Sequence, residues 1–185
     1  MPSRQIWRCS RIRTEWLTAS ELDLALRLLT PANRLAMELC IATGLRISDA
    51  LGLRTAQIQG GGRITVKEQK TGKSRRITIP APLVRDLRAN AGRVWVFEGA
   101  RDPEKHRTRQ AVWKDVKRAA KAARIPANAG THSARKVYAV KLYRKRGLDA
   151  AQAALNHDDP TVTMVYALAD ALRTRRGSKK VDKYR

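Results

Sequence analysis

Acidic residues are scarce in this sequence. Its 185 residues include 39 Lys and Arg but only 16 Asp and Glu, which gives a formal net charge of +23. A chain with so large an excess of one charge repels itself unless an anionic partner offsets it. Nucleic acid is therefore the favoured partner, and an anionic membrane surface is the weaker alternative.

Long apolar runs and cysteines are also missing. No apolar run is long enough to span a bilayer, and none follows the basic N-terminus as it would in a secretory signal. Cys9 and Cys40 are the only cysteines, and their spacing suits neither a metal site nor a disulfide framework. We therefore expect a cytoplasmic protein with no membrane span. The apolar fraction of 43% is enough to bury a core.

Helical patterns cover most of the chain. Thr18 and Glu21 form a capping-box pattern, and helical spacing of apolar residues follows. A second helix is predicted from Pro31 to about Thr43, with Gly44 as its C-terminal stop. A short helix follows at about 48–53. Further helices are predicted around residues 112–123, 132–146 and 149–155, and after residue 160, with a stop at Gly147.

One stretch has the period of a β-strand instead. Residues 63–67 and 76–79 alternate between polar and apolar types, and a polar, basic tip lies between them. This pattern predicts a β-hairpin whose second strand ends at Pro80 and Pro82. Residues 94–97 are consistent with a short strand or an apolar turn. The predicted fold class is α+β, mainly α-helical with a small antiparallel sheet.

Three segments carry residues suited to chemistry. Arg46 follows a helix stop, where its planar guanidinium can bind two phosphate oxygens at once. Pairing with Asp49 alone, or a place in a helix-turn-helix, would explain Arg46 equally well. Lys70 lies at the hairpin tip. The third segment is C-terminal and contains His132, Arg135, His157 and Tyr166.

In combination, these elements resemble the catalytic domain of the tyrosine recombinase (phage integrase) family. The resemblance extends over about residues 15–170 and rests on several elements that recur in one order. They are the Ala-Thr-Gly-Leu-Arg-Ile-Ser-Asp segment at 42–49, the hairpin lysine, the His-x-x-Arg pair at 132–135, and a histidine nine residues before a tyrosine.

The resemblance implies a role for each of these residues. Tyr166 would attack a phosphodiester and form a covalent 3′-phosphotyrosine. Arg46 and Arg135 would hold the phosphate, and Lys70 would be the general acid for the leaving 5′-oxygen. His132 and His157 would add hydrogen bonds, and Asp49 would support the site. Four basic residues of the hairpin would bind DNA: Lys67, Lys73, Arg75 and Arg76.

The expected protein is a site-specific DNA recombinase that needs no metal, cofactor or ATP, because no carboxylate cluster, Cys/His set or nucleotide-binding loop is present. Double-stranded DNA is its expected partner, bound by a homotetramer that is monomeric when free, with a DNA-bending accessory protein as a further partner. Expected localisation is the cytoplasm of a bacterium, at the nucleoid. A type IB topoisomerase-like enzyme and a non-catalytic helix-turn-helix-like DNA-binding protein are the alternatives.

The expected organisation has three parts. Residues 1–14 form a basic arm or linker remnant, residues 15–170 form the catalytic domain, and residues 171–185 form a basic tail that either docks on a neighbouring protomer or is simply solvated. Most members of the family carry a further N-terminal helical domain. The chain is therefore either a fragment or one of the short recombinases that lack that domain.

Overall fold

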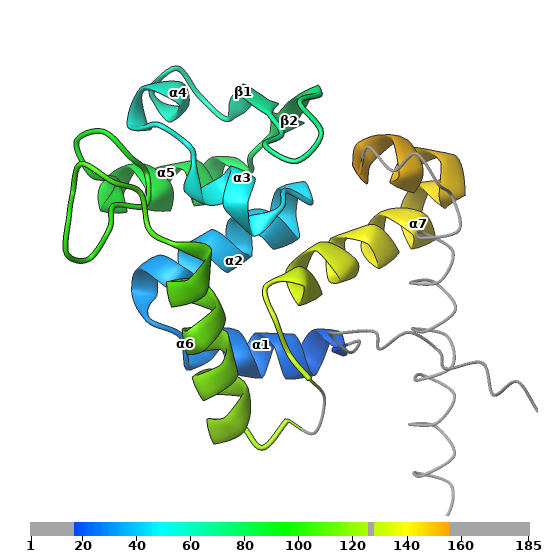
Figure 1. The fold of residues 1–185 in the computed structure, drawn as a ribbon. Helices are drawn as coiled ribbons and strands as arrows, with labels where there is room; N and C mark the ends of the chain where they lie inside the picture. Colours follow the sequence, from blue (N-terminus) through cyan, green and yellow to red (C-terminus); the bar gives the residue numbers. More distant parts are fainter. Residues whose placement is uncertain (1–16, 126–127, 156–185) are drawn as a thin grey trace, which may run out of the picture.

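The structure is a computed structural model that describes residues 17–125 and 128–155. Within these ranges, two antiparallel strands are surrounded by helices (Figure 1). The elements are α1 (Ala19–Arg27), α2 (Pro31–Thr43), α3 (Ile47–Leu51), α4 (Thr55–Gln59), β1 (Arg63–Lys67), β2 (Ser74–Thr78), α5 (Ala81–Asn90), α6 (Arg109–Ala122) and α7 (His132–Leu155). The predicted fold class is confirmed.

Local sequence signals set the ends of the first helices. The capping box at α1 is present: Glu21 donates its backbone N–H to the Thr18 hydroxyl at 3.3 Å and accepts the Thr18 N–H at 2.8 Å. Helix α2 runs from Pro31 to Thr43, as predicted. It ends because Gly44 has a positive φ of 69°, a conformation that L side chains rarely adopt.

Helix α2 lies at the centre of the fold (Figure 1). Its apolar face packs into a core shared with α3, α5, α6 and α7, and Ala36, Leu39 and Cys40 are fully buried there. Burial raises the pKa of the Cys40 thiol to about 12, so this cysteine is a packing residue at neutral pH.

Two helices were not anticipated from the sequence. Helix α4 has only five residues, and α5 starts directly after Pro80, which we interpreted as the end of a strand. Pro82 lies in the first turn of α5, where a missing N–H costs nothing. A proline after β2 is therefore compatible with the end of a strand and also with the start of a helix. Residues 94–97 form no strand. Trp95 makes a single isolated bridge with Arg54, and Val96 and Phe97 are buried.

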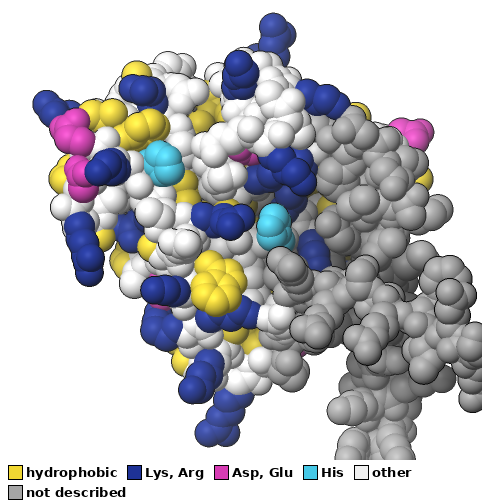
Figure 2. Space-filling view, viewed as in Figure 1, with side chains coloured by type: hydrophobic (Ala, Val, Ile, Leu, Met, Phe, Trp, Pro, Cys, Tyr) yellow, Lys and Arg dark blue, Asp and Glu magenta, His cyan; other side chains and the backbone are white. Residues whose placement is uncertain are grey.

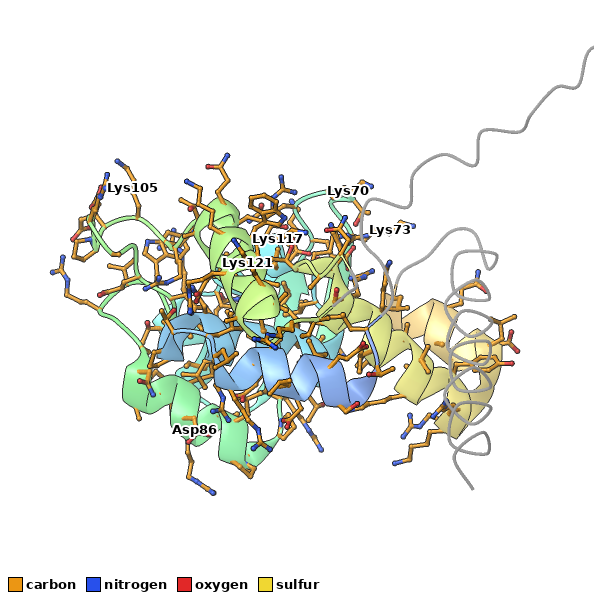
Figure 3. The ribbon with its side chains drawn as sticks, turned by 90° about the horizontal axis from the view of Figure 1, so that it is seen from below. Lys70, Lys73, Asp86, Lys105, Lys117 and Lys121 are labelled. Atoms are coloured by element: carbon orange, nitrogen blue, oxygen red, sulfur yellow. The ribbon has the colours of Figure 1, made fainter. Side chains whose placement is uncertain are left out.

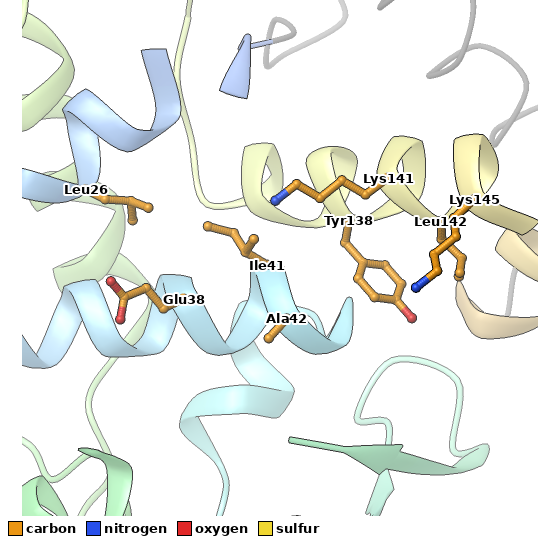
Figure 4. Close-up of a pocket in the computed structure, with 8 residues that line it drawn as sticks. All are labelled: Leu26, Glu38, Ile41, Ala42, Tyr138, Lys141, Leu142 and Lys145. Carbon is orange, nitrogen blue, oxygen red and sulfur yellow. The ribbon is translucent and has the colours of Figure 1, made fainter. Parts of the chain in front are cut away.

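Gly147 interrupts α7, as predicted. Its φ of 83° and ψ of −178° are not helical, so α7 consists of a long first part and a short second part (Figure 1). A hollow of about 510 Å³ lies where α7 faces α1 and α2, lined by Leu26, Glu38, Ile41, Ala42, Tyr138, Lys141, Leu142 and Lys145 (Figure 4). None of the helices within the described ranges is long and apolar enough to cross a membrane.

Candidate active site

Arg46 lies between the end of α2 and the start of α3. Its side chain is 16% exposed, and its Nη1 donates a hydrogen bond of 2.5 Å to Glu68 Oε2. Asp49 Oδ2 is 4.0 Å from the same nitrogen. The simple pairing of Arg46 with Asp49 is therefore the weaker of two contacts, and the main partner comes from the hairpin.

Glu68 was not among the residues expected at the site. It directly follows β1, its side chain is fully buried, and it also accepts a hydrogen bond of 2.8 Å from the Thr71 hydroxyl. Burial alone would raise the pKa of Glu68, but the hydrogen bonds from Arg46 and Thr71 outweigh it and the net pKa is lowered. A sequence signal existed, because Glu68 continues the buried alternation of Ile64 and Val66.

Asp49 connects α3 to the hairpin turn. Its Oδ1 accepts the backbone N–H of Gln69 at 3.0 Å, while its buried Oδ2 has no hydrogen-bond partner among the described residues. Burial raises the pKa of Asp49, and the Gln69 N–H opposes that shift. The contact holds the turn that carries Lys70 beside the helix end that carries Arg46.

Arg135 is buried on the first turn of α7. It donates to the carbonyl of Gly44 at 2.7 Å and to the carbonyl of Leu155 at 2.5 Å. The Arg135 guanidinium therefore lies at the C-terminal end of α2, where Gly44 precedes Arg46 by two residues. The positive charges of Arg46 and Arg135 both act to lower the pKa values of Glu68 and Asp49.

His132 begins α7, three residues before Arg135, and its side chain is exposed. Its pKa is nevertheless lowered, first by partial desolvation within the surrounding protein and then by the positive charges of Arg109, Arg135, Lys136 and Arg46. The shift favours the neutral ring, which is the form that can accept a proton.

Lys70 occupies an exposed turn between the strands. Gly72 donates its N–H to the Glu68 carbonyl at 2.8 Å and has a φ of 67°, so the chain curls here. Strand β1 ends at Lys67, so Lys70 lies outside the regular strand, and the side chains of Lys67, Lys70 and Lys73 are all exposed.

Arg75 requires a correction as an expected DNA contact. It is 8% exposed, and its guanidinium donates to the carbonyl of Thr43 at 2.6 Å and to that of Ala154. It lies on the core face of the sheet, opposite Val66, whereas its neighbour Arg76 is exposed. The parity of Ile77 predicts this burial, because Arg75 and Ile77 are two residues apart.

The remaining expected site residues, His157 and Tyr166, lie outside the described residues, as do the whole expected N-terminal arm and the whole C-terminal tail. Within the described ranges, no three His, Cys, Asp or Glu side chains gather closely enough to hold a metal ion.

Positive side chains spread over the face seen in Figure 2, where acidic ones are few. In Figure 3, Lys70, Lys73 and Lys105 project from one side of the molecule, with Lys117 of α6 on the same side, while Asp86 projects from the opposite side. The hairpin tip and α6 thus contribute to one basic surface.

Comparison with known proteins gives a consistent result. The sequence model of the phage integrase family matches residues 15–173. The chain is 32% identical over 154 residues to the tyrosine recombinase XerD of Mycobacterium tuberculosis. The aligned region covers 76% of this chain and 49% of XerD. It is 31% identical over 147 residues to the probable integrase/recombinase YoeC of Bacillus subtilis, and that aligned region covers 75% of this chain and 78% of YoeC. The chain thus spans about half the length of XerD.

Solved structures with the same fold include a lambda integrase dimer bound to a COC′ core site, with a TM-score of 0.72 and 23% identity over 85% of this chain and 60% of that one. The XerH site-specific recombinase bound to palindromic difH substrate, in a post-cleavage complex, has a TM-score of 0.69 and 22% identity over 89% of this chain and 52% of that one. Because the family model covers most of the sequence and the fold agrees with it, this chain belongs to the phage integrase family of tyrosine recombinases.

Proposed function

We propose that this chain cleaves and rejoins DNA strands at specific sites through a covalent link between Tyr166 and a 3′-phosphate. The observation that carries the proposal is that Arg135 binds the Gly44 carbonyl at the end of α2, while Arg46, two residues further along the chain, binds Glu68 of the hairpin. The site is cationic and is built from segments that are far apart in the sequence. Its residues are those that the family resemblance assigns to the reaction.

The two arginines supply what a phosphodiester lacks, which is stabilisation of negative charge as the phosphorus gains a fifth oxygen. Their N–H groups are already oriented by protein acceptors: Arg46 by Glu68, and Arg135 by two backbone carbonyls. Donors oriented in advance stabilise the transition state without reorganisation. Each terminal guanidinium nitrogen carries two hydrogens, so one guanidinium can donate several hydrogen bonds in a planar fork.

In the reaction that we propose, the Tyr166 oxygen attacks phosphorus, and the bond from phosphorus to the 5′-oxygen breaks. Neutral His132 accepts the tyrosine proton, and Lys70 donates a proton to the leaving 5′-oxygen. His157 adds a hydrogen bond to the phosphate. In the reverse step, a 5′-hydroxyl attacks the phosphotyrosine. The covalent link conserves the bond energy, so no ATP is consumed.

DNA contacts in this proposal come from the exposed side chains of the hairpin, Lys67, Lys73 and Arg76. Solved structures of lambda integrase include a dimer on a core site and a tetramer on a Holliday junction. By analogy, we propose that this chain binds double-stranded DNA and acts as a homotetramer on it, with a DNA-bending protein as an accessory partner.

Trapping on a nicked suicide DNA substrate tests the proposal. Wild-type protein should form a covalent complex, also in EDTA, and Tyr166→Phe should form none while still binding DNA. Tyr143→Phe is the matched control, because Tyr143 is an exposed tyrosine of α7, and it should trap normally. A covalent complex with Tyr166→Phe, or activity that EDTA abolishes and magnesium restores, would contradict the mechanism.

Two alternatives make different predictions. A type IB topoisomerase-like enzyme would relax a supercoiled plasmid that has no paired sites, whereas a recombinase would exchange strands between two sites. A helix-turn-helix protein would use α3 as its recognition helix. However, α3 has only five residues, and Ile47, Ala50 and Leu51 are buried, so little of it remains to contact bases.

A further inference from the structure

Two buried arginines from different elements bind the same pair of helix ends. Arg75, on β2, donates to the carbonyls of Thr43 and Ala154. Arg135, on α7, donates to the carbonyls of Gly44 and Leu155, which are the next residues along the chain in each case. Both guanidiniums therefore join the C-terminal end of α2 to the C-terminal end of α7.

Helix ends explain why these charges are tolerated inside the protein. The last carbonyls of a helix have no partner within it, and they carry the negative end of the helix dipole. A buried cation that donates to such carbonyls gives them hydrogen-bond partners and places its positive charge at the negative end of the dipole. Burial lowers the pKa of Arg75, and the charges of Glu68 and Asp49 oppose that shift. Arg75 thus has an acceptor at each helix end and carboxylates nearby.

The contact of Arg75 and Arg135 with the C-terminal end of α7 matters because this end leads toward Tyr166 in the sequence. Leu155 is the last residue of α7, and Tyr166 follows it by only eleven residues in the sequence. Because Gly147 separates the second part of α7 from the first, this short helix has to be held by contacts of its own. Arg75 and Arg135 make such contacts with its final carbonyls.

We propose that Arg75 is a positioning residue that anchors the C-terminal end of α7 and thereby sets where the chain leaves toward the tyrosine. The second part of this statement rests on the proposed function of Tyr166. Arg75 itself contacts no DNA. Its effect on strand cleavage passes through the α7 end and through Arg135, which shares the two helix ends with it.

Arg75→Lys and Arg75→Gln test this inference, with Arg63→Gln as the matched control. Lysine keeps the charge but cannot bind two carbonyls through a planar fork. Arg63 is an exposed arginine on the paired strand β1. The first measurement is hydrogen–deuterium exchange of the free protein. Exchange over residues 148–155 should accelerate in both Arg75 variants and remain as in wild type in Arg63→Gln, while α5 remains unchanged in all three.

The second measurement is single-turnover covalent trapping at saturating nicked DNA. Displacement of a reacting group by about 1 Å costs on the order of 10²-fold in rate. We expect Arg75→Lys to lose about that factor in the maximal rate, with the half-saturating DNA concentration and the final yield unchanged. Arg63→Gln should leave the maximal rate unchanged.

Three results would overturn the inference. They are a wild-type rate in Arg75→Lys, wild-type exchange over residues 148–155 in both Arg75 variants, and a loss confined to the yield, which would mean that only the folded fraction had fallen. If the wild-type protein itself forms no covalent complex, the proposed function fails. The anchoring of α7 by Arg75 is then decided by the exchange measurement.

Discussion

At the residue scale, Gly44 combines two requirements in one position. It ends α2 with a φ of 69°, and a Cβ built on it would lie 2.4 Å from the Tyr138 ring. Tyr138 reaches this helix end from α7 (Figure 4). The Gly44 carbonyl also accepts the hydrogen bond from Arg135. A side chain at this residue would therefore disturb both the α2–α7 packing and the site.

Replacing this glycine tests the packing. A left-handed alanine costs roughly 1–2 kcal/mol, and overpacking adds roughly 1–3 kcal/mol. We expect Gly44→Ala to lower the free energy of unfolding by roughly 2–5 kcal/mol in urea denaturation. Gly72→Ala is the control, because its φ is 67° and no atom lies within 4 Å of the added Cβ. It should cost roughly 1–2 kcal/mol, and equal losses in the two variants would argue against the clash.

His132 is the second case at this scale. Its pKa is lowered from 6.5, so protonation favours the unfolded chain, and this residue's contribution to stability is lost as the pH falls below 6.5. An NMR titration should give a pKa below 6.5 in the folded protein. Arg109→Ala should raise it, because the Arg109 charge is one of the causes, while replacing the exposed Arg101 with alanine should leave it unchanged.

At the scale of elements, Asp115 connects α6 to the start of α2. One of its oxygens accepts the backbone N–H and hydroxyl of Thr30, both at 2.9 Å, and the amide of Asn33 at 2.7 Å. Thr30 is the N-cap residue of α2 but makes no side-chain cap to its own helix. A carboxylate from α6 thus meets the N-terminus of α2, where negative charge is favourable.

Removing this carboxylate should loosen the helix pair. Burial alone would raise the pKa of Asp115, but the hydrogen bonds from Asn33, Thr30 and Arg118 lower it below 3.8. We expect Asp115→Ala to reduce the free energy of unfolding at pH 7 by roughly 2–3 kcal/mol. The difference from wild type should narrow as the pH falls below 3.8, where the carboxylate becomes protonated. Asp86→Ala, exposed on α5, should change little, and a difference that persists in acid would contradict the electrostatic explanation.

At the scale of the whole molecule, the charge of +23 dominates. Binding to DNA through about six phosphate contacts predicts a slope of roughly −5 for log K against log salt concentration. Lys117→Ala should make the slope shallower by about 1. Arg85→Ala should leave it unchanged, because Arg85 is an exposed residue of α5, and Asp86 of that helix projects from the side opposite Lys70, Lys73 and Lys105 (Figure 3). Titrations at several salt concentrations measure this, and a slope near zero would mean that the charge serves another purpose.

Signals between near neighbours in the sequence determined much of this protein. The capping box at Thr18, the limits of α2 at Pro31 and Gly44, the hairpin and the break at Gly147 were all predictable, because each depends on the backbone preferences of a few adjacent residues. Arg46, Asp49, Lys70, His132 and Arg135 were identified by their order in the chain. Their roles, like those of His157 and Tyr166, stay predictions.

Only the tertiary structure decided which side chains meet. Glu68 reaches Arg46 across 22 residues, and Arg75 reaches Thr43 and Ala154 across 32 and 79 residues. Strand parity with Ile77 places Arg75 on the buried face of the sheet. Only the fold shows that the hairpin sets it between two helix ends whose carbonyls need donors. Such partners become neighbours only when the core forms, so residue types and local spacing alone could not identify them.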